Sequence, residues 1–177
     1  SHNPADDNGV KLLGATGRKL ENEVEAQVEA LLVSDQDLGE VDKKGKQRRS
    51  KQLVGEYVSW LRNDAFPELN FGGAKILVDC ANGAASQVAP RLLRAFGAEP
   101  FLIHDKPNGR NINDGCGALY PEVAAAAVQA DGCALGVSLD GDADRSILVD
   151  SKGRVLDGDA ILAGLAPHLE NETQTVV

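Results

Sequence analysis

After residue 75 the hydrophobic pattern alternates between two periods, and this alternation limits the fold more than any other feature. Short apolar runs, several rich in β-branched residues, predict strands, and the stretches between them carry apolar residues at helical spacing. The expected strands and helices, in alternation, are Lys75–Asp79, Ser86–Phe96, Glu99–Ile103, Pro121–Val128 and Ala134–Leu139. A hairpin of two further strands, Ser146–Asp150 and Arg154–Leu156, is expected to follow. We therefore predict an α/β fold in three layers, α/β/α, with a mixed sheet.

Three more helices are expected outside this region. Apolar residues recur at helical spacing over Leu20–Leu32 and again over Leu53–Leu61, so each stretch predicts an amphipathic helix. The first of these is expected to pack on a neighbour. Between them, residues 34–51 change to a basic composition without interleaved aromatic residues, which favours an exposed linker over a nucleic-acid site. We place a domain boundary there, and we expect Asp157 or Asp159 to cap a last helix.

Composition and charge limit the partners of the chain. An apolar fraction of 42% allows a sizeable core, and a formal net charge of −9 argues against nucleic acid and anionic membrane as partners. No apolar run approaches the ~20 residues that cross a bilayer, and no signal-peptide pattern is present. The cysteines, Cys80, Cys116 and Cys133, show neither metal-type nor disulfide-type spacing, so a reducing cytoplasm is the expected setting.

The segment Asp140–Arg145, which we call the acidic loop, joins two predicted strands. Asp140, Asp142 and Asp144 stand at alternate positions and would repel one another, which favours a bound cation. Oxygen ligands alone indicate a hard divalent ion, Mg²⁺ before Ca²⁺ or Mn²⁺. A helix–loop–helix calcium site is excluded, because Arg145 and Ser151 occupy the positions that require Gly and Glu. The alternative is a solvated turn rich in Asp.

The first eleven residues, Ser1–Lys11, have the composition of a loop and bring a hydroxyl, an imidazole and an ammonium group together. Such groups serve nucleophilic catalysis, and they are also ordinary in a polar surface loop. Both interpretations stay open on composition alone. Because the chain starts with Ser and contains no Met, we expect it to be a fragment of a longer protein.

Read together, two motifs resemble the α-D-phosphohexomutase superfamily. The opening sequence SHNPADDNGVK resembles its phosphoserine loop, and the later sequence DGDADR resembles its magnesium loop. The intervening DCANGA and PNGRNINDGCGALYPE are most similar to phosphoglucosamine mutases. The resemblance implies that residues 1–50 are the end of a phosphoserine-bearing domain 1 with a linker. It further implies that residues 51–156 are a complete domain 2 with the metal loop, and that residues 157–177 begin domain 3.

The resemblance also implies roles for individual residues. Ser1 matches the serine that carries the phosphoryl group, and a phosphate oxygen on it would join the three aspartates as a ligand of Mg²⁺. Arg145 matches the arginine facing the phosphoserine and Lys11 the lysine that aids proton transfer, while His2 has a supporting role. Ala143 departs from the pattern, which has Gly there, and it strains the loop if that position requires a positive φ.

The activity implied is a Mg²⁺-dependent interconversion of glucosamine 6-phosphate and glucosamine 1-phosphate through a sugar bisphosphate intermediate, in cytoplasmic synthesis of cell-wall precursors. A hexosamine phosphate is the expected substrate, and a homodimer is left open. The alternatives are a phosphomannomutase or phosphoglucomutase of the same superfamily, and a metal-binding fragment without catalysis. For the single residues, the alternative is that Arg145 is an ion-pair partner of a neighbouring aspartate and Lys11 a surface lysine.

Overall fold

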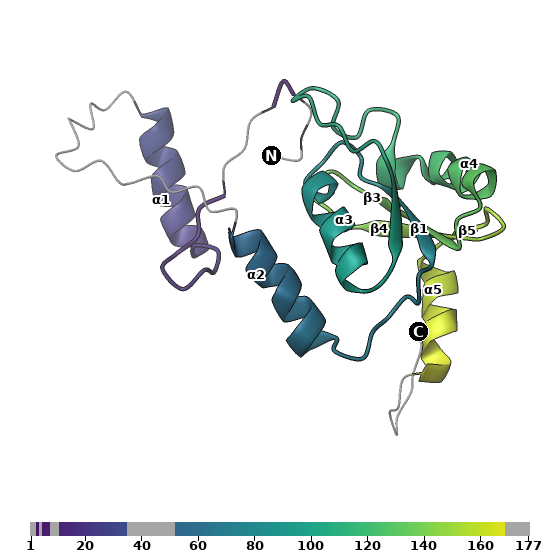
Figure 1. The fold of residues 1–177 in the computed structure, drawn as a ribbon. Coiled ribbons are helices and arrows are strands. Elements are labelled where there is room, and N and C mark those ends of the chain that lie inside the picture. Colours follow the sequence, from purple (N-terminus) through teal and green to yellow (C-terminus); the bar gives the residue numbers. More distant parts are fainter. Residues whose placement is uncertain (1–2, 4, 8–10, 35–51, 169–177) are drawn as a thin grey trace. The chain divides into compact units, whose positions relative to one another are not determined.

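The structure, a computed structural model, describes residues 3, 5–7, 11–34 and 52–168 (Figure 1). Its described residues divide into two compact units. The smaller unit lies within Gly9–Ser50 and the larger within Lys51–Val177, together with described residues that precede Asn8. Each unit is described by itself below.

The larger unit is built on a five-stranded sheet with the strand order β2-β1-β3-β4-β5. Its strands are β1 (Lys75–Asp79), β2 (Glu99–Ile103), β3 (Leu135–Leu139), β4 (Ser146–Asp150) and β5 (Val155–Leu156). Strand β1 pairs in parallel with β2 and β3, whereas β3 with β4 and β4 with β5 are antiparallel. The predicted mixed sheet is confirmed.

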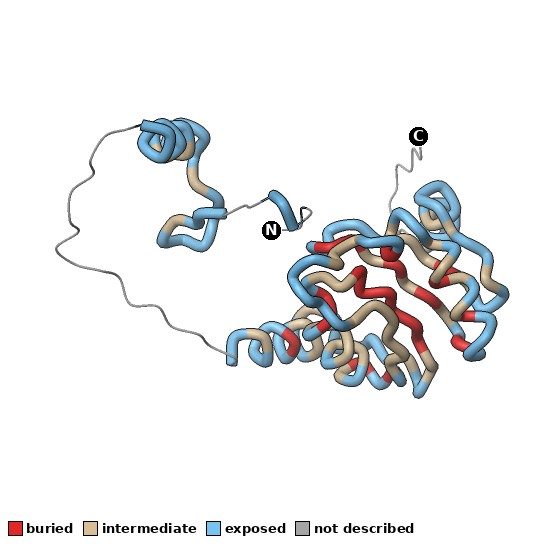
Figure 2. The backbone as a smooth tube through the Cα atoms, turned by 90° about the horizontal axis from the view of Figure 1, so that it is seen from above, coloured by how far each residue is buried: buried red, intermediate tan, exposed pale blue. Residues whose placement is uncertain are grey.

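Helices cover both faces of this sheet. Neighbouring residues of a strand point to opposite faces, so adjacent residues of β1 contact different helices. Leu77 packs with Ala124 and Val128 of helix α4 (Pro121–Asp131), and Val78 packs with Ala85 of helix α3 (Ala85–Ala95). Figure 1 shows α3 and α4 on either side of the strands, and in Figure 2 the buried residues lie in the larger unit. The predicted three-layer α/β/α arrangement is therefore confirmed.

The remaining elements of this unit frame the sheet. Helix α2 (Gln52–Trp60) continues into a π-helical turn, Leu61–Ala65, and helix α5 (Gly158–Leu165) follows β5. Of the two caps considered for α5, Asp157 provides the bond, accepting from the Ala160 N–H at 2.9 Å. Short 3₁₀ turns occupy Gly117–Leu119 and Ala166–His168.

The smaller unit contains helix α1 (Asn22–Val33), close to its predicted position. None of its residues is buried, and its apolar side chains at Val24, Leu31, Leu32 and Val33 are exposed. The predicted helix is present, but no buried face that would pack on a neighbour is found in the described part of this unit. No helix among the described residues has the length and apolar character needed to cross a bilayer.

Candidate functional site

Three parallel strands end at one edge of the sheet, and the loops that follow them meet there. The chain runs from β1 to β2 on one side and returns to β3 on the other side of β1, so the strand order reverses between β1 and β3. Open α/β sheets bind ligands at such a reversal, outside the carboxyl ends of the strands. Asp79, at the end of β1, lies opposite Ser138 of β3. The acidic loop follows directly after β3.

The acidic loop is a tight connection between antiparallel strands β3 and β4, whose last pair is Leu139 with Ser146. The Ala143 N–H donates to the Asp140 carbonyl oxygen at 3.0 Å and closes a turn. Ala143 adopts φ +60°, a left-handed conformation that costs an L-residue with a Cβ roughly 1–2 kcal/mol. The position therefore requires a positive φ, and Ala in place of Gly strains the loop.

The turn brings Asp140, Asp142 and Asp144 together, with one carboxylate oxygen of each within 4.8 Å of the others. An octahedral Mg²⁺ ion with bonds of about 2.0–2.1 Å holds neighbouring ligand oxygens roughly 3 Å apart and opposite ones roughly 4 Å apart. Three oxygens at this spacing fit one such ion with little adjustment. Asp140 is buried and the other two are exposed, so an ion held there would be open to solvent and to a further ligand.

Arg145 is bound to the first of these aspartates. Its Nη2 and Nε lie 2.8 and 2.9 Å from Asp140 Oδ2, and its backbone N–H donates to Asp140 Oδ1 at 3.1 Å. Burial would raise the pKa of Asp140, but the hydrogen bonds and positive charge of Arg145 outweigh burial and hold the pKa below its ordinary value. The same hydrogen bond raises the pKa of Arg145. Its side chain is still 67% exposed, so the guanidinium can meet a phosphate while it holds Asp140.

A neighbouring loop braces the acidic loop through close backbone packing. Gly83 lies so near Gly141 that a Cβ added to it would stand 2.7 Å from the Gly141 Cα atom. The Ala84 N–H donates to the Gly141 carbonyl oxygen at 2.9 Å. On its other side, Gly141 faces Ile112 and Asn113 of the long loop between β2 and α4. Both loops thus contribute to the architecture of the acidic loop.

The other predicted site residues lie elsewhere in the chain. Ser1 and His2 fall outside the described residues. Lys11 is exposed and lies in the smaller unit, and Asn3 is exposed in the larger one. The structure thus brings together Asp140, Asp142, Asp144 and Arg145.

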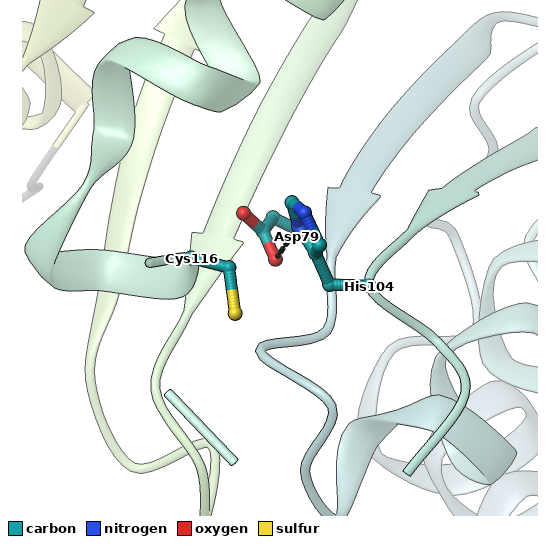
Figure 3. Close-up of side chains that lie close together, drawn as sticks. All are labelled: Asp79, His104 and Cys116. Atoms are coloured by element: carbon teal, nitrogen blue, oxygen red, sulfur yellow. Dashed lines mark hydrogen bonds and ion pairs between the residues drawn. The ribbon is translucent and has the colours of Figure 1, made fainter. Parts of the chain in front are cut away.

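A second group of side chains, which we call the Asp79 cluster, consists of Asp79, His104 and Cys116 (Figure 3). The buried Asp79 carboxylate accepts hydrogen bonds from the Ala81 N–H at 3.0 Å, the His104 Nδ1 at 3.0 Å and the Gly117 N–H at 2.9 Å. It therefore ties together the ends of β1 and β2 and the loop before Gly117.

The cysteines of this region are buried thiols. Burial, followed by the charges of Asp79 and Asp114, raises the pKa of Cys116, and burial raises the pKa of Cys80 to about 12. Sequence spacing did not indicate the Asp79 cluster, because its members come from separate segments. A signal was nevertheless present, since Asp79 ends one predicted strand and His104 follows the next, and parallel neighbours end at the same edge.

Comparison with known proteins places these loops within one recognised domain. Residues 55–153 match the family model described as phosphoglucomutase/phosphomannomutase, α/β/α domain II. The chain is 42% identical to a phosphoglucosamine mutase of Wolinella succinogenes over 175 residues, and 48% identical to one of Syntrophotalea carbinolica over 166 residues. These alignments cover 97% and 92% of this chain but 39% and 36% of the relatives. The chain thus spans less than half the length of the curated relatives it matches.

A solved structure shares the fold. The crystal structure of a putative phosphomannomutase from Thermus thermophilus superposes with a TM-score of 0.68 at 24% sequence identity, over 94% of this chain and 38% of that one. At this identity the likeness concerns the fold alone.

Proposed function

The chain belongs to the phosphoglucomutase/phosphomannomutase family, and from that premise we propose that it is part of a phosphoglucosamine mutase. The enzyme would interconvert glucosamine 6-phosphate and glucosamine 1-phosphate through a phosphoserine and a sugar bisphosphate. Relatives named phosphoglucosamine mutase, 42–48% identical over most of this chain, support the choice of sugar. The observation that carries the chemistry is the acidic loop, with three carboxylate oxygens gathered beside the guanidinium of Arg145.

A metal cofactor is implied by the family, and we propose Mg²⁺ held by Asp140, Asp142 and Asp144. The all-oxygen donor set and its spacing support a hard divalent ion there. When bound, the ion would neutralise charge on the phosphoryl oxygens, the main requirement of phosphoryl transfer. A phosphate oxygen on Ser1 would provide a further ligand.

The other residues of the proposed site would have separate roles in phosphoryl transfer. In the first half-reaction the bond from Ser1 Oγ to phosphorus breaks, and a bond forms from phosphorus to a sugar hydroxyl oxygen, whose proton passes to a base. Lys11, as the neutral amine, would take this proton and deliver it to the departing Ser1 Oγ, and the reverse transfer would accompany the second half-reaction. Arg145 would orient the phosphate by paired hydrogen bonds. In the second half-reaction the other phosphate of the bisphosphate returns to Ser1 Oγ.

We also propose the setting of this activity. Residues 1–50, 51–156 and 157–177 would be the end of domain 1 with a linker, domain 2 and the start of domain 3 of a longer enzyme. A cytoplasmic location is supported by three buried cysteines, all free, which suit a reducing compartment. The family model, which covers phosphoglucomutases and phosphomannomutases, favours those activities as the second candidate.

The experiment measures turnover and phosphorylation of the longer enzyme that contains this sequence. With Mg²⁺ present, glucosamine 6-phosphate is expected to equilibrate with glucosamine 1-phosphate, followed by ³¹P NMR, and mass spectrometry is expected to find phosphate on Ser1. Both are expected to disappear in Ser1→Ala and to persist in Ser151→Ala, which changes an exposed turn serine. Turnover of mannose or glucose phosphates without the amino sugar would favour the second candidate. Turnover that survives Ser1→Ala would refute the phosphoserine mechanism.

A further inference from the structure

We propose that the Asp79 cluster is a binding site for a borderline transition-metal ion, zinc in the first instance, distinct in chemistry from the acidic loop. It offers one thiol, one imidazole and one carboxylate, with a ligand atom of each within 4.8 Å of the others. Zinc in proteins is held by this combination of sulfur, nitrogen and oxygen, whereas Mg²⁺ selects oxygen alone. The proposal concerns this cluster only and does not depend on the mutase function.

The ligand atoms lie within 4.8 Å of one another, near the spacing that one tetrahedral ion requires. Bonds of about 2.0–2.3 Å separate the ligands of tetrahedral zinc by roughly 3.3–3.8 Å. His104 Nδ1 and Asp79 Oδ1 are 3.0 Å apart and share a proton, so an ion between them requires a small outward shift. Figure 3 shows the Asp79 carboxylate between the side chains of His104 and Cys116. Ligands from three segments thus already surround one place.

Each ligand can offer a lone pair to the ion. Asp79 Oδ2 accepts one bond, from the Gly117 N–H, and keeps a second lone pair. Burial raises the pKa of the Cys116 thiol, and the hydrogen bond that Asn82 Nδ2 donates to Cys116 Sγ at 3.8 Å acts in the opposite sense. Binding would release the Cys116 thiol proton to solvent. The shared proton would move from Nδ1 to Nε2, which leaves the imidazole neutral and Nδ1 free to coordinate.

The cluster combines two buried ligands with one that is partly exposed. Asp79 and Cys116 are fully buried, while the His104 side chain is 33% exposed. Among the described residues, the Asp79 carboxylate is hydrogen-bonded to backbone N–H groups and His104, and no Lys or Arg forms an ion pair with it. A divalent cation would supply the positive charge that this buried carboxylate lacks, and water could complete its coordination from the exposed side of His104.

Backbone strain is concentrated at the same place. His104 has φ +47°, and Ala81 and Asn82 have φ +49°, although none of the three is glycine. Conformations of this kind are unfavourable for residues with a Cβ and persist where the surrounding structure holds them. At His104 the strained backbone turns the imidazole onto Asp79, and a bound ion would add a bond that holds it there.

The test uses the full chain without an affinity tag, in excess Mg²⁺ so that hard oxygen sites are filled. Co²⁺, which adopts zinc geometry and reports its ligands, is titrated while the absorption spectrum is recorded. We expect one equivalent of Co²⁺ to give a thiolate-to-cobalt charge-transfer band together with the intense visible bands of tetrahedral cobalt. Zn²⁺ is expected to remove both by displacement, as its higher affinity requires.

Matched variants identify the ligands. Cys116→Ser is expected to abolish the charge-transfer band, whereas Cys80→Ser and Cys133→Ser, at the other two buried cysteines, keep it. His104→Asn removes the imidazole but tolerates a positive φ, and it is expected to weaken Zn²⁺ binding by at least about tenfold. Circular dichroism checks the fold of each variant, with Cys116→Ala as the substitute if the serine unfolds the chain. Cobalt that binds without a thiolate band, or a band that survives loss of Cys116, would overturn the proposal, as would no binding.

Discussion

Asp79 and Asp140 stand at the ends of neighbouring strands and are both buried, at 0% and 3% exposure, yet they hold different things. Asp79 accepts from two backbone N–H groups and an imidazole, and so joins three segments of chain. Asp140 is paired with the guanidinium of Arg145 and faces two exposed aspartates of its own loop. Burial alone does not set the role of a carboxylate, since Asp79 is held by backbone and imidazole groups whereas Asp140 is held by an exposed guanidinium.

Because their partners differ, substitutions in the two regions should affect different properties of the protein. Substitutions in the acidic loop should affect metal binding and transfer more than folding, because two of its three carboxylates are exposed. Substitutions in the Asp79 cluster should affect folding first, because each donor that loses Asp79 is left without its partner.

The largest effect is expected for Asp142→Asn on phosphoryl transfer. The substitution keeps the shape of an exposed side chain but removes one charge from the proposed ion site. We expect the mutase rate of the longer enzyme to fall at least about 100-fold, the scale for losing one preorganised electrostatic contact, and Mg²⁺ affinity to fall with it. The thermal midpoint is expected to stay within a few degrees, because relieved repulsion offsets any lost contact. Unfolding with unchanged metal affinity would show instead that the loop is architectural.

The opposite pattern is expected for Asp79→Asn. An amide offers one acceptor oxygen and a donor where the carboxylate accepted three bonds, so at least one buried donor is left unpaired. The free energy of unfolding, measured by urea titration, is expected to fall by about 3 kcal/mol, at the upper end for one such group. Asp114→Asn, at an exposed position in the loop before Gly117, is the control and should change the free energy of unfolding little. Equal stability of Asp79→Asn and Asp114→Asn would contradict the structural role of Asp79.

A third effect concerns acid stability. The pKa of Asp140 lies below its ordinary value in the folded chain, so its pairing with Arg145 contributes fully above the unfolded pKa and is lost as pH falls through the folded one. Unfolding free energies measured between about pH 7 and pH 3 should therefore decline less steeply in Asp140→Asn than in the parent chain.

Asp150 offers an independent check on this decline of the unfolding free energy with falling pH. Backbone N–H bonds from Arg154 come first among the causes that lower its pKa, ahead of the opposing effect of burial. Asp150→Asn should flatten the acid decline in the same sense. If the unfolding free energy of both variants fell with pH as steeply as that of the parent chain, the assignment of the acid decline to Asp140 and Asp150 would be contradicted.

Much of the fold could be predicted from the sequence, because the apolar periods of strand and helix are local. Strands β1, β2 and β4 begin and end where the pattern placed them, and the acidic loop was found because its carboxylates lie within five positions. The exposed apolar side of α1 shows the limit, since periodicity predicts which face is apolar but not what covers it.

The Asp79 cluster shows a second limit. Its members are ordinary residues in separate segments, and only the parallel pairing of β1 with β2 brings Asp79 and His104 together. A contact that depends on tertiary pairing leaves little trace in spacing along the chain. The conformation of Ala143 likewise came only from the structure, because the sequence showed the departure from Gly but not the φ of that position.

The smallest effect is expected for Ala143→Gly. Glycine removes the steric cost of φ +60°, roughly 1–2 kcal/mol, but it also adds freedom to the unfolded chain, worth roughly 0.5–1 kcal/mol. The balance predicts a gain of about 0.5–1 kcal/mol in the free energy of unfolding, measured by urea titration.

Ala84→Gly is the matched control for this change. Ala84 is exposed in the loop that braces Gly141 and has φ −61°, so the same atoms are removed where no strain is relieved. It should lose about 0.5–1 kcal/mol, because only the unfolded-state cost remains. Opposite signs for the two substitutions would place the strain in the acidic loop itself. Equal signs would mean that the loop relaxes around Ala143 and that the departure from Gly costs nothing.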